Sequence, residues 1–197
     1  AFRLAGVHSG VKSVPENEDL TLVVSDVPAV GAGVYTKNLV YAAPVAVDRE
    51  RTPGEAFRAV VINSGNANAC TGERGLDDAR RITQLAADVC DAKQEQALVL
   101  STGIIGEYLP MDKITRGIEA AAARLGNDEK ALISAARGMM TTDTVHKLSG
   151  RVLSLGNREI SITGMAKGAA MIGPNMATML GLILTDAPLT AEVAQSS

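Results

Sequence analysis

The sequence predicts a mixed α/β (α+β) fold in which helices pack on layered sheets. Short segments rich in valine and bounded by Gly, Pro or Asn dominate the first third of the chain and indicate strands. Segments with apolar residues at spacings of three and four follow in the middle and indicate amphipathic helices. Since no internal repeat or long polar linker interrupts this order, we expect residues 1–197 to form a single domain.

Four strands are expected in the first third of the chain. Each is short, rich in β-branched residues and flanked by residues that favour turns. They are residues 19–25, 33–36, 44–48 and 58–63. The chain therefore opens with a β-rich region, and a further strand is expected at residues 97–100.

Three helices are expected in the middle of the chain. Residues 75–92 carry apolar side chains on one helical face, with Asp77 and Asp78 in the first turn, where acidic groups offset the helix dipole. Residues 111–125 predict a second helix that ends at Gly126. Asp128 is a suitable N-cap for a third helix, which runs to about residue 138.

The last third is expected to contain three strands. Residues 151–155 and 159–163, joined by Gly156-Asn157, predict a hairpin. Residues 179–185 are almost wholly apolar, which predicts a strand covered on both faces. We therefore expect Thr178 to open a strand near the middle of a sheet.

Composition argues against several functional classes. The 19 basic and 22 acidic residues give a formal charge of -3 and form no block of one sign, so neither nucleic acid nor an anionic membrane is an expected partner. The longest apolar run, at about 176–184, is too short to span a bilayer. Two cysteines make no secreted disulfide framework, so a cytoplasmic location is expected, with a removed leader left open by the start at Ala1.

Few side chains are candidates for catalysis on spacing alone. His8 and His146 are the only histidines and lie in no cluster with metal-ligand spacing, so neither a metal site nor a Ser-His-Asp triad is expected. Lys12 is interpreted as surface charge, and Cys70 as a buried structural thiol.

A glycine-rich segment around Lys167 is open to two interpretations. It lacks the residue order of a phosphate-binding loop, and its composition alone predicts a tight turn between buried strands. However, Lys167 precedes Thr178 by eleven positions, and Pro174 and an apolar run flank that threonine. A buried lysine beside a threonine hydroxyl is a chemically reasonable activation pair.

Four motifs connect the chain to a known family. They are residues 63–72 (NSGNANACTG), residues 101–106 with 109–111 (STGIIG and LPM), residues 140–144 (MTTDT) and residues 165–180 (MAKGAAMIGPNMATML). In sequence and in order they resemble the ornithine acetyltransferase family. The similarity covers nearly the whole chain and about half of a family member. It equates residues 1–177 with the family's alpha chain and residues 178–197 with the start of its beta chain, so the rest of the second half is absent.

The resemblance implies a self-cleaving fold of the N-terminal-nucleophile type. Family members cut their own backbone before a threonine, here between Ala177 and Thr178, and that threonine becomes the nucleophile. An acetyl group then passes from N-acetylornithine to glutamate through an acetyl-threonine intermediate, without a dissociable cofactor. Some members also use acetyl-CoA, and the resemblance leaves this activity open. The freed α-amino group of Thr178 is the implied general base, since its ordinary pKa is about 7.7 to 8.0.

The resemblance also assigns roles to other residues. Thr102 and Gly103 correspond to the family's oxyanion hole, although an ordinary glycine bend is the simpler interpretation of these two residues alone. Substrate contacts are assigned to Thr178, to Lys167, which would neutralise a carboxylate, and to Thr141 or Thr142. Either of the two adjacent threonines matches.

The implied partners lie partly outside the chain. The family's second half supplies further substrate contacts, so we expect a partner chain bearing it and a homo-oligomer of two-chain protomers. Two alternatives stay open: an amidohydrolase or aminopeptidase that also self-cleaves but transfers to water, and an inactive truncated subunit.

Overall fold

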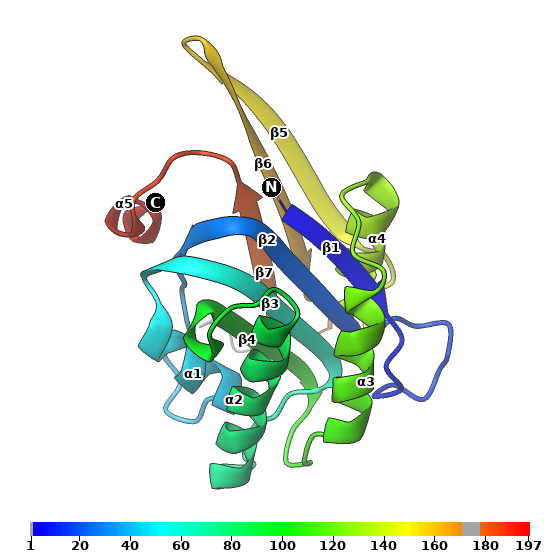
Figure 1. Cartoon of the computed structure of the whole chain (residues 1–197). Helices are drawn as coiled ribbons and strands as arrows, with labels where there is room; N and C mark the ends of the chain where they lie inside the picture. The colour runs from blue at the N-terminus through cyan, green and yellow to red at the C-terminus, as the bar shows by residue number, and fades with distance from the viewer. Residues whose placement is uncertain (1, 171–177) are drawn as a thin grey trace.

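The computed structural model describes residues 2–170 and 178–197 as two sheets with helices packed against them (Figure 1). The mixed α/β class expected from the sequence is confirmed. The elements are β1 (Phe2–Val7), β2 (Leu20–Gly31), α1 (Ala43–Arg51), β3 (Gly54–Asn66), α2 (Gly72–Asp88), η1 (Gln94–Gln96), β4 (Ala97–Ile104), α3 (Met111–Ala122), α4 (Glu129–Gly138), β5 (Lys147–Leu155), β6 (Arg158–Lys167), β7 (Leu180–Thr185) and α5 (Ala191–Ser196).

The first sheet has the strand order β1-β2-β3-β4. β2 pairs antiparallel with β1 and with β3, whereas β4 pairs parallel with β3. A parallel pair needs a crossover connection, and α2 with η1 provides it. As a result the carboxyl ends of β3 and β4 lie side by side, with Ser64 opposite Thr102 and Gly65 opposite Gly103.

Both faces of the first sheet are buried. Successive side chains along a strand point to opposite faces, and those of β2 enter two different cores. Leu22 and Val24 of β2 belong to a core with α1, α2 and α3 on one face. Val23, between them, belongs to a second core formed with α4, β6 and β7 on the other face. The molecule is therefore layered: helices, first sheet, and then α4 beside the second sheet (Figure 1).

The three expected helices of the middle region are confirmed, with shifted ends. α3 begins at Met111 as predicted, and the Asp128 side chain caps α4 by accepting a hydrogen bond from the Ala131 N–H at 2.8 Å. α2 begins three residues earlier than expected, so its first acidic residue is Glu73 rather than Asp77.

The strand expected at residues 44–48 is wrong, because this segment forms α1. Its buried residues, Pro44, Val47 and Asp48, lie three and four positions apart and so share one helical face. Proline in the first turn costs no hydrogen bond, because the first N–H groups of a helix have no partner within the helix. Burial of one helical face therefore outweighs the β-preference of the valines.

The strand expected at residues 33–36 is also wrong. The register between β2 and β3 shifts after Val24, and the pairing ends where Gly31 meets Gly54. Among the described residues no strand pairs with the segment that follows, and side chains hold it instead: the Tyr35 hydroxyl lies 2.6 Å from Thr52 Oγ1.

Side chains of α1 form hydrogen bonds with backbone groups at the outer edge of β4. The Asp48 carboxylate accepts hydrogen bonds from the Val99 N–H at 3.0 and 3.2 Å, and Arg51 donates to the Ala97 carbonyl at 2.6 Å. These contacts occupy backbone groups that an open edge strand would leave exposed. They also hold in place the strand that leads to Thr102.

Asp48 should make stability depend on pH. Burial raises the pKa of Asp48 to about 8, above the ordinary value of 3.8, although the hydrogen bond from Val99 and the charge of Arg51 oppose the shift. The folded state thus binds the proton more tightly than the unfolded state, and this contribution to stability is lost as pH rises from about 4 through about 8.

Asp48→Asn keeps an acceptor oxygen but does not titrate. We expect the free energy of unfolding of this variant, measured with urea, to show a flatter pH dependence across that range. Equal slopes for Asp48→Asn and the parent would contradict this.

The second sheet has the order β5-β6-β7, and all pairs are antiparallel. The expected hairpin is confirmed as β5 and β6, which extend beyond the end of the first sheet (Figure 1). Residues 179–185 are expected to need cover on both faces, and the described chain supplies it on one face. Leu180, Leu182 and Leu184 pack on the second core, whereas Ile183 is 72% exposed.

Thr178 precedes β7, whose position in the second sheet follows from the strand order. β7 lies at the edge of its sheet among the described residues, which corrects the expectation that Thr178 opens a strand near the middle. None of the helices in residues 2–170 and 178–197 combines the length and the apolar content needed to cross a membrane.

Candidate active site

Lys167 joins three segments at one buried point. It is the last residue of β6 and is only 4% exposed. Its ammonium donates hydrogen bonds to Thr102 Oγ1 and to the main-chain carbonyl of Thr178, each at 3.0 Å. Burial lowers the pKa of Lys167, the Asp143 carboxylate raises it, and the Lys147 ammonium lowers it. The structure thus brings together three of the residues singled out in the sequence.

Thr102 and Gly103 lie in the last residues of β4, rather than in a turn that follows the strand. Thr102 is buried, and its hydroxyl oxygen accepts the hydrogen bond from Lys167. An ammonium group has only donors, so the hydroxyl hydrogen of Thr102 remains available for an acceptor other than Lys167. A hydroxyl that is polarised in this way is suited to stabilise a developing oxyanion.

Gly103 is required by the packing of the strand ends. Its φ of 137° lies in a region that disfavours side chains, and a Cβ atom here would overlap the Gly65 carbonyl and lie 2.5 Å from the Asn66 nitrogen. These are backbone atoms of the neighbouring strand and cannot move aside cheaply. A side chain at Gly103 is therefore excluded by β3 itself, independently of any role in an oxyanion hole.

This geometry predicts a large difference between two glycine variants. We expect Gly103→Ala to lower the free energy of unfolding by roughly 3 kcal/mol or more, from overlap added to backbone strain. Gly106 also has positive φ, at 86°, but has no atom within 4 Å of an added Cβ. Gly106→Ala should therefore cost only about 1 to 2 kcal/mol. Equal losses in denaturant unfolding would show that strain, rather than contact with Gly65, dominates.

Asparagine side chains build the end of β3 and the loop after it. Asn63 donates to the Asn66 carbonyl at 2.8 Å and accepts from the Ser101 hydroxyl at 2.6 Å, which links β3 to β4. Asn66 donates to the Glu107 and Tyr108 carbonyls at 3.1 and 3.3 Å, and so anchors the loop after β4. The motif at residues 63–72 thus has a structural role beside Thr102.

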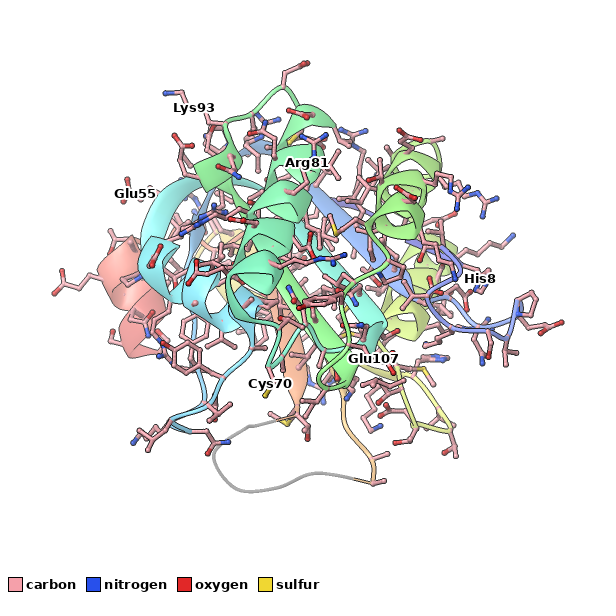
Figure 2. All side chains as sticks on the ribbon, turned by 90° about the horizontal axis from the view of Figure 1, so that it is seen from below. His8, Glu55, Cys70, Arg81, Lys93 and Glu107 are labelled. Carbon is pink, nitrogen blue, oxygen red and sulfur yellow. The ribbon has the colours of Figure 1, made fainter. Side chains whose placement is uncertain are left out.

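The structure contradicts the interpretations of Cys70 as a buried thiol and of Lys12 as surface charge. Cys70 is exposed, on the end of the molecule seen in Figure 2, and is not a buried thiol. Lys12 is not free surface charge, because its ammonium donates to the Glu18 and Met140 carbonyls at 2.8 and 2.7 Å. Burial lowers the pKa of Lys12, against the charges of Asp19 and Glu18.

Thr141 and Thr142 lie in the loop after α4, next to the end of β6. Thr141 is half-buried and donates its N–H to the Asp143 carboxylate at 3.2 Å, whereas Thr142 is exposed. Asp143 also accepts the Gly168 N–H at 2.9 Å and forms an ion pair with Lys147. This carboxylate was missed as a site residue, although it falls within the motif at residues 140–144.

Thr178 lies two residues before β7, and its carbonyl oxygen is the acceptor for Lys167. The cleavage expected between Ala177 and Thr178 involves Ala177, which lies outside the described residues. Together, the described side chains offer a buried ammonium, a polarised hydroxyl and a threonine with a second hydroxyl, a set suited to acyl transfer.

Sequence comparisons identify relatives over the whole chain. A family model described as the ArgJ family matches residues 3–197. The chain is 46% identical over 196 residues to the arginine biosynthesis bifunctional protein ArgJ of Rhodopirellula baltica, and 51% identical over 186 residues to that of Geobacter sulfurreducens. These matches cover 100% and 94% of this chain but 48% and 47% of the relatives. The chain thus spans about half the length of the curated relatives it matches.

Solved structures show the same fold. ArgJ from Bacillus halodurans superposes with a TM-score of 0.80 and 39% identity, over 91% of both chains. The ornithine acetyltransferase of Mycobacterium tuberculosis, solved in complex with ornithine, gives a TM-score of 0.79 and 34% identity over 91% of this chain and 92% of that chain.

Proposed function

This chain belongs to the ArgJ family, and we propose that, within a full-length protein, it supplies the nucleophile of an acetyltransferase. The reaction is transfer of an acetyl group from N-acetylornithine to glutamate. One observation carries the proposal: the buried Lys167 ammonium donates both to Thr102 Oγ1 and to the Thr178 carbonyl. The relatives' names, which include arginine biosynthesis and ornithine acetyltransferase, support the same reaction.

The first step is cleavage of the chain before Thr178. The Thr178 hydroxyl oxygen attacks the Ala177 carbonyl carbon, the C–N bond breaks, and the threonine nitrogen takes up the proton. Water then hydrolyses the resulting ester and releases the Ala177 carboxylate. The new α-amino group has an ordinary pKa of about 7.7 to 8.0, so near neutral pH a substantial fraction is unprotonated and available as a base.

Transfer then proceeds in two half-reactions. The α-amino group of Thr178 takes the hydroxyl proton while the oxygen attacks the acetyl carbonyl of N-acetylornithine. Collapse of the tetrahedral intermediate breaks the C–N bond and releases ornithine with the proton. The glutamate amine next attacks the acetyl-threonine ester, which yields N-acetylglutamate and regenerates the hydroxyl. No dissociable cofactor enters this sequence.

Thr102 and Lys167 are assigned to charge stabilisation. The Thr102 hydroxyl and the Gly103 N–H would donate to the oxyanion of each tetrahedral intermediate. Lys167 would hold the main chain of Thr178, polarise Thr102 and attract a substrate carboxylate. Thr141 or Thr142, in the adjoining loop, would complete this side of the substrate site.

An acetyl-acceptor assay separates the proposal from its main alternative. Full-length protein is incubated with N-acetylornithine, with and without glutamate, and the products are measured by mass spectrometry. The proposal expects N-acetylglutamate to form in step with ornithine. Release of free acetate at the same rate without glutamate would instead identify a self-cleaving amidohydrolase. Replacing N-acetylornithine by acetyl-CoA tests the second acetyl donor.

The missing half is proposed to pack on the second sheet. Three large apolar residues lie on the face of this sheet that points away from the second core and are exposed in the described chain: Ile183 at 72%, Leu155 at 60% and Leu153 at 44%. We expect the second half to cover this surface within a homo-oligomer of two-chain protomers. Native mass spectrometry of the full-length protein gives the stoichiometry, and an inactive single chain would favour the truncated-subunit alternative. A cytoplasmic location is retained as a proposal, although a relative from Chaetomium globosum is named as mitochondrial.

A further inference from the structure

Asp143 lies where the loop after α4 meets the end of β6. Its side chain is fully buried. One carboxylate oxygen accepts the Gly168 N–H at 2.9 Å and contacts the Lys147 ammonium, and the other accepts the Thr141 N–H at 3.2 Å. A single carboxylate therefore ties together two segments that are 25 residues apart in sequence.

These contacts act on the site through the backbone. Gly168 directly follows Lys167, whose ammonium joins Thr102 and Thr178. Holding the Gly168 N–H fixes where β6 ends, and so fixes the position from which the lysine side chain reaches the other two residues. Lys12 also holds this loop, because its ammonium donates to the Met140 carbonyl at 2.7 Å.

We propose that Asp143 is a positioning residue for the transfer reaction: it holds the end of β6 against the Thr141 loop and faces Lys167 with a negative charge that Lys147 balances. This inference rests on the proposed function. It adds a residue that acts through Lys167 and does not itself touch the substrate.

Asp143 and Lys147 have opposite effects on the pKa of Lys167. Asp143 is the anion that acts on Lys167, and Lys147 and Lys12 are the cations. Burial lowers the pKa of Lys167, Asp143 raises it, and Lys147 lowers it. Burial alone would raise the pKa of Asp143 itself, but the Lys147 ammonium and the N–H groups of Gly168 and Thr141 outweigh it and lower that pKa to about 2. Asp143 is thus ionised wherever the enzyme works.

Two variants with opposite expected shifts test the proposal in the full-length enzyme. The α-amino group of Thr178 must be neutral to act as a base, so activity falls at low pH, whereas loss of the Lys167 charge lowers activity at high pH. Asp143→Asn removes the stabilising anion and leaves Lys147 uncompensated. It should move the basic limb of the kcat/KM profile to lower pH by about one unit or more. Lys147→Met removes a repelling cation and should move that limb to higher pH.

A second readout does not depend on catalysis. The ¹³C chemical shift of Lys167 Cε, assigned by its loss in Lys167→Met, reports the ionisation of this lysine as pH is varied. It should shift in the same two directions in the two variants. If the parent enzyme fails to transfer acetyl but the NMR shifts occur, the proposed function is wrong and the placement of Asp143 stands.

Other outcomes overturn the proposal. A merely structural role predicts that both variants lose activity with unchanged or equally displaced pH profiles. Should Asp143→Asn fail to fold, Lys147→Met still decides, because an unshifted or lowered Lys167 titration in that variant contradicts the proposed balance of the Asp143 and Lys147 charges at Lys167.

Discussion

Thr178→Ala is expected to abolish both chain cleavage and acetyl transfer in the full-length protein. The reason is chemical: the proposed mechanism uses one hydroxyl oxygen first against the Ala177 carbonyl and then against the acetyl carbonyl, and alanine has none. Intact-mass measurement should find one uncut chain, and the transfer assay should show no product above the uncatalysed rate.

Thr178→Ser is the matched control. Serine keeps the hydroxyl and the main-chain carbonyl that accepts from Lys167, so it should retain part of both activities. Loss of transfer in the alanine variant with cleavage intact would separate the two steps and assign the cleavage to another group. Normal cleavage and transfer in Thr178→Ala would exclude this residue as the nucleophile.

Thr102→Val is expected to lower kcat by about 100-fold to 1,000-fold, with a much smaller change in KM. Valine nearly preserves the shape and the β-branching of threonine but lacks the hydroxyl that accepts from Lys167 and donates onward. It therefore removes an interaction that strengthens as the oxyanion develops. Unlike a change at Gly103, it adds no atom against the backbone of β3.

Thr102→Ser distinguishes chemistry from packing at this position. It restores the hydroxyl and should recover most of kcat, because the small loss of a methyl group affects mainly stability. If valine and serine both raise KM and leave kcat intact, Thr102 positions the substrate and the oxyanion is stabilised elsewhere.

Much of the fold could be predicted where local signals and packing agree. α3, α4 with its Asp128 cap, and the β5–β6 hairpin each carry their own pattern of apolar spacing, capping or turn residues. α1 could not be identified in this way, because its valines favour a strand. Its helical form depends on burial of Val47 and Asp48 against β4, which is a tertiary contact.

The site was predictable only in part. Resemblance named Thr102, Lys167 and Thr178, and the spacing of Lys167 and Thr178 suggested that these two lie together, but nothing in the sequence indicates that the same ammonium also contacts Thr102. Asp143 was missed because its importance lies in hydrogen bonds from Thr141 and Gly168, which local sequence does not reveal. The interpretation of Lys12 as surface charge was wrong for the same reason. Its partners are the main-chain carbonyls of Glu18 and Met140, and local sequence does not show that the chain brings them to the lysine.

The central claim is that Thr178 becomes an N-terminal residue that carries the acetyl group, and trapping that intermediate tests it most directly. Full-length protein is mixed with N-acetylornithine in the absence of glutamate, quenched in acid, and analysed by intact-mass and peptide mass spectrometry. We expect two chains, the second beginning at Thr178 and bearing one acetyl group that disappears when glutamate is added, as N-acetylglutamate forms. An active but uncut chain, or an acetyl group on any other residue, would contradict the account.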